Sequence, residues 1–264
     1  MNEVVSKEFT HLKIHTQYSI CEGALKTTDL AKYCKENKIR AIGLCDSNNL
    51  CGALEFSESI AKSKTQPIIG TQINILHKGQ IGKIPLFAKN LEGYKNLIKL
   101  SSKSYLGIKE NEIPHCKIED LEQNFKGLIL LSGSFDGLVG KLFFKNLTDE
   151  ISYLLKKFKI IFKDNFYIEI QRHNDKNEIF FENFNLKISK KLNIPIIATH
   201  EIYYLDKSTY EAHDALICIG NKTYVNEKNR LKFSDQHYFK NNSEMSELFA
   251  DLPEALENNY NFPL

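Results

Sequence analysis

Three residues near the amino terminus have side chains that could take part in chemistry. His11, Lys13 and His15 stand two positions apart. On a β-strand, side chains alternate between the two faces, so we expect these three on one face and Leu12 and Ile14 on the other. Imidazoles bind metal ions and an ammonium binds phosphate, so this strand could belong to either kind of site. A polar strand end with hydrogen-bonded histidines explains the same pattern equally well.

Polar residues also follow two apolar runs further along the chain. Asp46 comes directly after the run 40–45, and His200 and Glu201 come directly after the run 194–198. A catalytic acid would suit the position of Asp46, although an ordinary helix cap is the commoner explanation. If the strands close into a barrel, their carboxyl ends meet at one rim and these residues converge with the first strand. Polar side chains that only solvate the rim would look the same, so the convergence names no reaction.

The segments that must position these residues alternate between two sequence patterns. Short runs rich in branched or aromatic residues predict strands at 9–15, 40–45, 67–75, 84–89, 127–132, 166–170 and 194–198. Segments of helical period predict helices at 28–38, 49–62, 93–105, 147–158, 178–192 and 208–219. A strand followed by a helix, repeated, is typical of α/β proteins, so we expect a distorted (β/α)7 barrel.

This alternation ends only after about Gly220. From there the sequence is more polar and has few strand-like runs. We therefore expect a barrel over residues 1–220 and a connecting extension, 221–264, that packs on it.

Composition limits the class of protein. Thirty-five Lys and Arg against 33 Asp and Glu give a formal charge of only +2, so any role on DNA must be local or indirect. The six cysteines show no C-x-x-C spacing and no secretory signal precedes them, which favours reduced thiols in a cytoplasm. The start, 1–8, is polar and no apolar stretch approaches the roughly 20 residues of a membrane span.

In order and spacing, the chain resembles the amino-terminal PHP (polymerase and histidinol phosphatase) domain of bacterial DNA polymerase III alpha subunits, over essentially its whole length. The matching stretches are FTHLKIHTQYS (9–19), DSNNLCG (46–52), PIIG (67–70), LFAKN (86–90), GYKNL (93–97), GLILLSG (127–133), YIEIQRH (167–173), PIIAT (195–199), AHD (212–214), EM (244–245) and LFADLPEAL (248–256).

The resemblance implies a fold and a former site. Metal-binding members carry histidines and acids at the carboxyl end of the barrel, which hold a trinuclear zinc-type centre that hydrolyses phosphoesters. In this sequence the corresponding positions of the cleft are Lys13, His15, Glu22, Asp46, Ser47, Gln72, Lys83, Ser134, Glu201 and Tyr203. Six of these positions have lost their ligand type outright, with lysine, serine, glutamine or tyrosine where the family has histidine, glutamate or cysteine. Glutamate stands for aspartate at Glu22 and Glu201.

The resemblance therefore implies a degenerate metal site with no intact catalytic residue. Metal ligands need lone pairs, which an ammonium lacks and an amide or hydroxyl supplies poorly. We expect no cofactor in this domain. His15, Glu22 and Glu201 are weak candidates for a single zinc or manganese ion, with partial compensation from His173 and His200.

Two of the lost ligands have become lysines, which suggests a replacement for the missing ions. Without metal, Glu22, Asp46 and Glu201 would repel one another in the cleft. We expect Lys13 and Lys83 to be the cations that offset this repulsion.

The function implied by the resemblance is that of a catalytically inactive scaffold in DNA replication. Such a domain would brace the palm and thumb of its own polymerase chain and offer a docking surface for the proofreading exonuclease subunit. The polymerase's catalytic aspartates, which use magnesium, would lie in a palm domain beyond residue 264, so the chain is expected to be a fragment of a larger nucleotidyltransferase.

Two other functions remain open. One is a metal-dependent 3′–5′ exonuclease or phosphoesterase working in the barrel. The other is direct DNA contact through the basic stretch 156–163, or through Lys99 and Lys103, although solvated helix faces look like this far more often.

Overall fold

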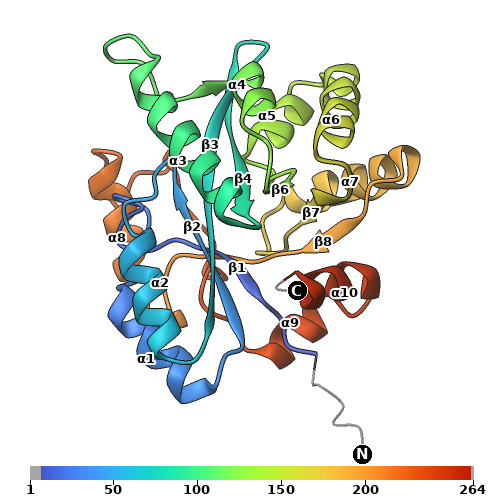
Figure 1. Cartoon of the computed structure of the whole chain (residues 1–264). Coiled ribbons are helices and arrows are strands. Elements are labelled where there is room, and N and C mark those ends of the chain that lie inside the picture. The colour runs from blue at the N-terminus through green and yellow to red at the C-terminus, as the bar shows by residue number, and fades with distance from the viewer. Residues whose placement is uncertain (1–6, 263–264) are drawn as a thin grey trace, which may run out of the picture.

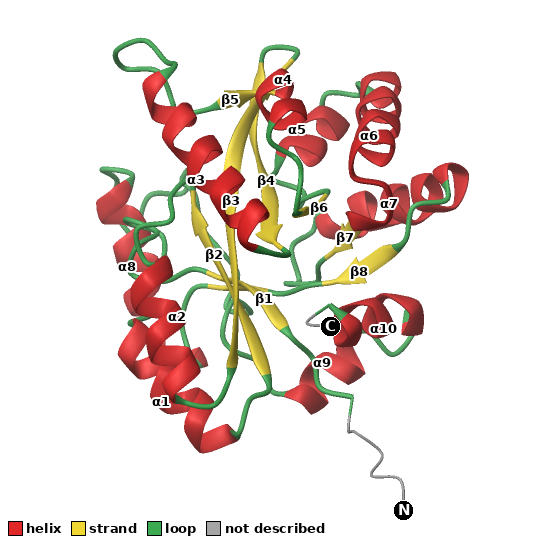
Figure 2. Ribbon diagram, viewed as in Figure 1, coloured by secondary structure: helices red, strands yellow, loops and turns green. Residues whose placement is uncertain are grey.

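A single curled β-sheet organises the molecule, which is a computed structural model that describes residues 7–262 (Figures 1 and 2). Along the path of the sheet the strands follow the order β8-β7-β6-β4-β3-β2-β1-β9, and β5 pairs with β3 beside this path. The strands are β1 (His11–Ile14), β2 (Ala41–Ser47), β3 (Gln66–His77), β4 (Gln80–Ala88), β5 (Cys116–Lys117), β6 (Leu128–Leu131), β7 (Phe166–Ile170), β8 (Ile196–Ala198) and β9 (Glu201–Ile202).

The two edges of this sheet are neighbours in the sequence. β8 pairs with β7 at one edge and β9 pairs with β1 at the other, yet only Thr199 and His200 separate β8 from β9. Three peptide steps reach about 10 Å at most, so the sheet must curl until its edges lie side by side. The predicted α/β barrel, distorted, is thereby confirmed.

Helices surround the sheet on its outer side (Figure 1). They are α1 (Thr27–Asn37), α2 (Ala53–Lys62), α3 (Leu91–Leu106), α4 (Ile118–Gln123), α5 (Leu138–Phe144), α6 (Thr148–Phe162), α7 (Glu178–Leu192), α8 (Tyr210–Gly220), α9 (Asn242–Leu248) and α10 (Pro253–Asn261), with short 3-10 turns at Lys163–Asn165 and Lys207–Thr209. α2 shows why they lie there: Ala53, Phe56 and Ile60 form a buried stripe at helical spacing.

All seven predicted strands and all six predicted helices are present, with ends shifted by a few residues. The expected repeat of strand then helix is interrupted where β3 and β4 form an antiparallel hairpin. Its turn, Lys78 and Gly79, takes left-handed backbone angles (φ 48° and 70°) that reverse the chain within two residues. Four short elements, β5, β9, α4 and α5, have no counterpart among the predictions.

The segment after Gly220 also carries two helices that were not predicted. Met245 of α9 and Leu256 of α10 are buried in the same core as Ile168 and Ile196 of the sheet. The side chain of Asn259 accepts a bond from the backbone N–H of Thr10 (2.8 Å) and donates to the carbonyl of Ala198 (3.0 Å). Residues 242–261 therefore pack on the barrel, whereas a domain boundary near 220 remains a prediction; residues 263–264 lie outside the described part.

Strand β1 contains a β-bulge. Along β1 the chain advances three residues, from His11 to Ile14, while the paired strand β2 advances two, from Ile42 to Leu44. One extra residue therefore fits into β1, and the alternation of faces is broken at that point.

The bulge corrects the prediction that His11 shares a face with Lys13 and His15. The ring of His11 packs 4.3 Å from that of Phe239, and its Nε2 lies 2.7 Å from the carbonyl of Lys240. Lys13 and His15 instead point into the barrel, toward Glu201. Only two of the three polar side chains of the strand reach the cleft.

Two expectations from composition can be compared with the structure. Within residues 7–262, no helix is both long and apolar enough to cross a membrane. The six cysteines are free thiols, four of them buried. The polar start of the chain lies outside the described residues up to position 6.

Candidate functional site

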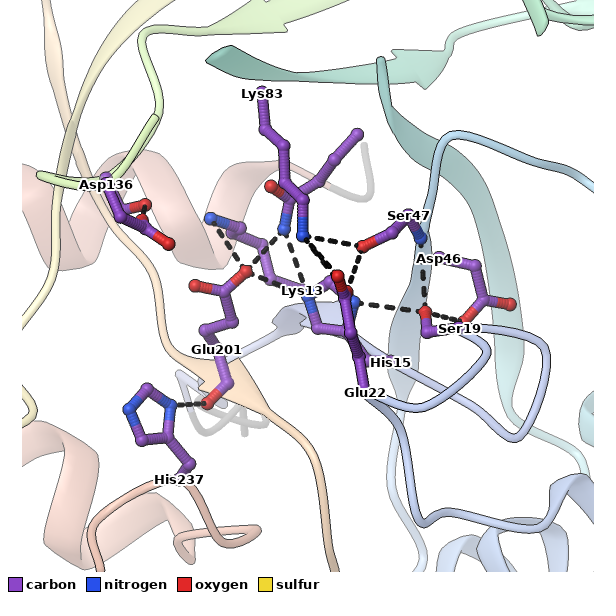
Figure 3. A network of polar contacts seen from close by, with 12 residues as sticks. Lys13, His15, Ser19, Glu22, Asp46, Ser47, Lys83, Asp136, Glu201 and His237 are labelled. Atoms are coloured by element: carbon purple, nitrogen blue, oxygen red, sulfur yellow. Dashed lines mark hydrogen bonds and ion pairs between the residues drawn. The ribbon is translucent and has the colours of Figure 1, made fainter. Parts of the chain in front are cut away.

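A cluster of buried charges fills the barrel at the carboxyl ends of its strands (Figure 3). The ammonium of Lys13, on β1, lies 3.2 Å from Oε1 of Glu169 on β7 and 3.5 Å from Oε1 of Glu201 on β9. Burial alone would lower the pKa of Lys13, but the two carboxylates outweigh burial and hold that pKa above its ordinary value. Lys13 is therefore a charged ammonium between two carboxylates.

Glu201 is the centre of this cluster. Its Oε1 also lies 2.8 Å from Nε2 of His15 and accepts a bond from the side-chain amide of Gln72. The ring of Tyr203 stacks on His15 with 4.5 Å between centroids. Burial would raise the pKa of Glu201, yet Lys13 and the bond from His15 pull it well below its usual range. Glu201 therefore stays ionised in the interior.

A second ion pair lies beside the first, nearer the surface. Nζ of Lys83, on β4, is 3.0 Å from each carboxylate oxygen of Glu22 and 2.9 Å from Oγ of Ser47. Ser47 in turn donates to Glu22, and the ring of His213 on α8 binds the backbone carbonyl of Glu22 at 2.8 Å. Burial opposes the charge on Glu22, but Lys83 holds its pKa below the ordinary value. One lysine and one glutamate thus close this side of the cleft.

Asp46 takes part in neither ion pair, which differs from the expectation. Its carboxylate accepts bonds from the backbone N–H of Thr16 (2.7 Å), the hydroxyl of Thr16 (2.8 Å) and the hydroxyl of Ser19 (2.7 Å). Burial outweighs these bonds and raises the pKa of Asp46. Asp46 therefore fixes the turn after β1, and Ser19 links it to the cluster, since the hydroxyl of Ser19 lies 3.2 Å from Nδ1 of His15.

The structure brings most of the predicted cleft positions together. Eight of them form the two linked groups described above: Lys13, His15, Glu22, Ser47, Gln72, Lys83, Glu201 and Tyr203. Ser134 stands apart, because its hydroxyl donates to Asp136 on the loop after β6. The side chain of Asp136 lies across the cleft from Lys83 in Figure 3.

Sequence reasoning missed the main partner of Lys13. Glu169 has a fully buried side chain on β7, and it also accepts bonds from Gln171 (2.7 Å) and from Thr199. A signal was present, since Glu169 interrupts the apolar run of its strand. A carboxylate in that position needs a buried cation, and Lys13 on the first strand is one. His237 was missed as well; its Nδ1 lies 3.1 Å from the backbone carbonyl of Glu201.

The two histidines considered as substitute ligands are committed to other bonds. Nδ1 of His173 lies 2.9 Å from Glu178, and its Nε2 accepts the backbone N–H of Glu201 at 3.2 Å. Nε2 of His200 lies 3.0 Å from the carbonyl of Tyr238. The rings of His173 and His200 stack with 4.5 Å between centroids. Burial lowers the pKa of His173 to about 4 and that of His200 well below its ordinary value. Both are neutral packing groups.

These donors do not fit a multinuclear metal centre. A charged ammonium stands between Glu169 and Glu201, and an amide and a hydroxyl stand where further ligands would be required. In the part of the chain that the structure describes, no group of three or more histidines, cysteines, aspartates or glutamates is arranged to hold an ion. The arrangement instead pairs its own ammonium groups with its own carboxylates.

Comparison with known proteins identifies a family and several relatives that are similar in sequence. The PHP domain family matches residues 11–173. A DNA polymerase III subunit alpha from Rickettsia bellii is 39% identical over 255 residues, covering 96% of this chain and 22% of the relative. Those from Caulobacter vibrioides and Borreliella burgdorferi are 37% and 36% identical, covering 98% and 95% of this chain and 23% of each relative. The chain thus spans less than a quarter of the length of these relatives.

Solved structures that align with this chain share much less of its sequence. A two-domain protein from Bacteroides vulgatus, containing a predicted PHP-like metal-dependent phosphoesterase, aligns with a TM-score of 0.47 at 11% identity, over 90% of this chain and 62% of that one. An amidohydrolase from Chromobacterium violaceum aligns with a TM-score of 0.48 at 9% identity, over 74% of this chain and 87% of that one.

Proposed function

Because this chain belongs to the PHP domain family and is homologous to DNA polymerase III alpha subunits along nearly its whole length, we propose that it acts in DNA replication as a catalytically inactive scaffold. The observation that carries the proposal is the ammonium of Lys13, which lies between two buried carboxylates at the rim where metal-binding relatives are expected to hold ions. The scaffold would support the palm and thumb of its own polymerase chain.

Inactivity follows from the charge of the cleft. A hydrolytic PHP site would need a metal ion to lower the pKa of a bound water. Here Lys13 already lies between Glu169 and Glu201, and Lys83 pairs with Glu22, so a divalent ion would have to enter beside two ammonium groups and be repelled by both. The cations of the protein itself would take over the structural role of the ions and leave no Lewis acid.

The proposal also covers the binding partners and the cellular compartment. The proofreading exonuclease subunit would dock on the barrel, DNA would be contacted only indirectly, and magnesium would be used in a separate palm domain of the polymerase. The cellular compartment would be the cytoplasm. A docking role suits a domain whose interior is kept rigid by internal ion pairs rather than opened for a substrate.

Elemental analysis tests the inactivity. The purified chain is expected to carry far less than one equivalent of zinc or manganese and to leave a phosphodiester intact in the presence of either ion. A stoichiometric ion, together with hydrolysis that His15→Ala abolishes, would establish instead a metal-dependent 3′–5′ exonuclease or phosphoesterase. Co-purification with the proofreading exonuclease tests the docking role separately.

A further inference from the structure

A cavity of about 220 Å³ opens at the carboxyl end of the barrel, beside the charge cluster. Its walls come from the loop after β6, the chain after β7, the first residue of β9 and the segment 230–237. Neither Lys13 nor Lys83 lines this cavity, in the part of the chain that the structure describes. Glu201 is the member of the cluster that reaches it.

Three carboxylates line the cavity, those of Asp136, Asp175 and Glu201. In Figure 3 the carboxylate of Asp136 points toward that of Glu201. Asp136 accepts the hydroxyl of Ser134, and Asp175 accepts the backbone N–H of Asn177 (2.8 Å). These donors are neutral and leave the negative charge in place, so the wall of the cavity is acidic.

The lysines of the cluster do not balance this charge. Lys13 lies between two carboxylates and Lys83 pairs with a third. Asp136 adds a fourth, so two ammonium groups stand against four carboxylates, with the histidines counted as neutral. The excess of negative charge attracts a further cation to the side of Glu201 that faces the cavity.

Two cations of the chain also line the cavity, and neither is free to fill it. Two nitrogens of Arg230 each lie 2.6 Å from an oxygen of Asp214. Lys232 is exposed, and its Nζ lies 6.0 Å from the centre of the ring of Tyr210, which does not line the cavity. Lys232 therefore stands at the rim.

A buried imidazole indicates independently that the cavity receives a hydrogen-bond donor. His237 lines the cavity and is only 7% exposed. Its Nδ1 lies 3.1 Å from the carbonyl of Glu201, and a carbonyl only accepts, so Nδ1 carries the proton. Nε2 then has a lone pair and no hydrogen-bond partner among residues 7–262. Burial lowers the pKa of His237 well below its ordinary value, which keeps this lone pair available. Stacking on His173, with 4.0 Å between centroids, fixes the ring.

The lining of the cavity suits an organic cation better than a metal ion. Within residues 7–262, no three histidines, cysteines, aspartates or glutamates are arranged to hold a metal ion. The rings of Phe135 and Phe233 line the same space. Aromatic rings attract organic cations and pack against methylene groups. A primary ammonium on an alkyl chain combines three N–H donors with an apolar surface, and both kinds of wall would be satisfied by it.

We propose that this cavity binds a small free aliphatic amine. The ammonium group would be held by Asp136, Glu201 and Nε2 of His237, and the alkyl chain would lie against Phe135 and Phe233. The ligand would join the loop after β6 to the segment 230–237 and so stabilise the open end of the barrel. This inference depends neither on the docking role nor on the inactivity proposed above.

Calorimetric titration of the purified chain with diaminobutane tests the inference, and butanediol serves as the neutral comparison. We expect the diamine to bind and to raise Tm, and the diol to do neither. Asp136→Asn removes an exposed carboxylate of the cavity and is expected to raise Kd about fivefold. Asp29→Asn, in the exposed first turn of α1, changes the net charge equally and is expected to leave Kd unchanged.

Two further variants test the imidazole and the rim. His237→Phe keeps a ring but lacks Nε2, and it is expected to raise Kd about tenfold. Its Tm without ligand reports whether it still folds. Lys232→Gln removes a competing cation from the rim and is expected to lower Kd about twofold, opposite in sign to Asp136→Asn.

The outcomes decide between an amine site and its alternatives. Equal binding of diol and diamine, or an unchanged Kd in Asp136→Asn, would overturn the inference. A loss as large in Asp29→Asn would mean attraction by net charge alone and would overturn it too. Nα-acetyl-lysine amide carries the same ammonium on a larger group and is expected to bind more weakly than the diamine. Tighter binding would identify a lysine side chain of another protein as the ligand, against a free amine.

Discussion

Nζ of Lys13 and Oε1 of Glu169 lie 3.2 Å apart, and neither side chain is exposed to solvent. The residues come from the first strand and from β7, 156 positions apart in the sequence, so only closure of the barrel brings them together. Removing two charges from water is costly, and their attraction in the interior offsets that cost only while both partners are present. The pair therefore ties the stability of the barrel to a cleft that we propose to be catalytically silent.

Replacing Lys13 by methionine is expected to destabilise the protein strongly. The substitution keeps most of the apolar stem of the side chain but leaves Glu169 and Glu201 buried and without their cation. Loss of one partner of a buried ion pair typically costs about 3–5 kcal/mol. Urea unfolding measures the change. Lys32→Met, on an exposed i,i+4 pair of α1, serves as the control and is expected to stay within about 0.5 kcal/mol.

The double variant Lys13→Met/Glu169→Gln is expected to regain part of the lost stability. Glutamine removes the uncompensated charge but keeps an oxygen that can accept the bond from Gln171. A double-mutant cycle gives the coupling directly. If Lys13→Met alone leaves stability unchanged to within roughly a few tenths of a kcal/mol, the ammonium does not hold the cleft together.

Replacing Lys83 by methionine is expected to have a smaller effect than the change at Lys13. The side chains of Lys83 and Glu22 are each about a quarter to a third exposed, at 26% and 31%, so water can solvate Glu22 after its partner is lost. Partial solvation limits the cost to about 1 kcal/mol. Thermal unfolding in low and high salt checks this, because salt should reduce the difference between Lys83→Met and the unaltered protein. An effect as large as that of Lys13→Met would place the pair in the interior.

Much of the fold could be predicted from the sequence because local pattern and burial agree along most of the chain. β7 and α7 are found at their predicted residues, since an apolar run and a helical stripe leave no alternative there. The bulge in β1 could not be predicted, because it depends on how β1 pairs with β2 and not on its own residues. The hairpin turn at Lys78 and Gly79 carried a glycine signal, but the strands on either side were treated as separate units.

The candidate site was predictable only in part, for a related reason. Lys13, His15 and Glu201 stand at strand ends whose convergence follows from any closed barrel. Glu169 was not predicted as a site residue. A buried carboxylate is understood only together with the cation that pairs with it, and that cation, Lys13, is far away in the sequence. Asp46 was expected among the ions, whereas nearby hydroxyl and backbone donors satisfy it.

Stability is expected to fall on acidification below about pH 6.5. Burial lowers the pKa of both His11 and His173 to about 4, whereas in the unfolded chain they titrate near 6.5. Between these values the unfolded chain binds more protons, so the stabilisation is complete above pH 6.5 and is lost as the pH falls toward 4. Each histidine then accounts for roughly 2 kcal/mol of lost stability at pH 5. Glu178, whose pKa burial raises to about 7, acts in the opposite direction and reduces the net loss.

Urea unfolding at a series of pH values between 7 and 5 measures this slope. His11→Gln removes one of the titrating groups and is expected to flatten the slope, whatever its effect at pH 7. His115→Gln, on the loop before β5, is the matched control and is expected to leave the slope unchanged. A slope that is the same in all three proteins would mean that His11 does not resist protonation in the folded state.

Gly43 lies opposite the bulge of β1, and its replacement by alanine tests the register that directs Lys13 into the cleft. A Cβ at position 43 would lie 2.4 Å from the backbone oxygen of Leu12, a distance that neither backbone can accommodate without moving. Overpacking of this kind costs about 2 kcal/mol. Gly107→Ala, at the end of α3, is a fair comparison, because the nearest atom there is 3.3 Å away and the backbone angle is negative. If Gly43→Ala is no more destabilising than Gly107→Ala, the strands are not as close at position 43 as the bulge requires. If Gly43→Ala is more destabilising, Lys13→Met is then combined with it. A smaller loss of stability from Lys13→Met in that background than in the unaltered protein would mean that the bulge holds the ammonium between its two carboxylates.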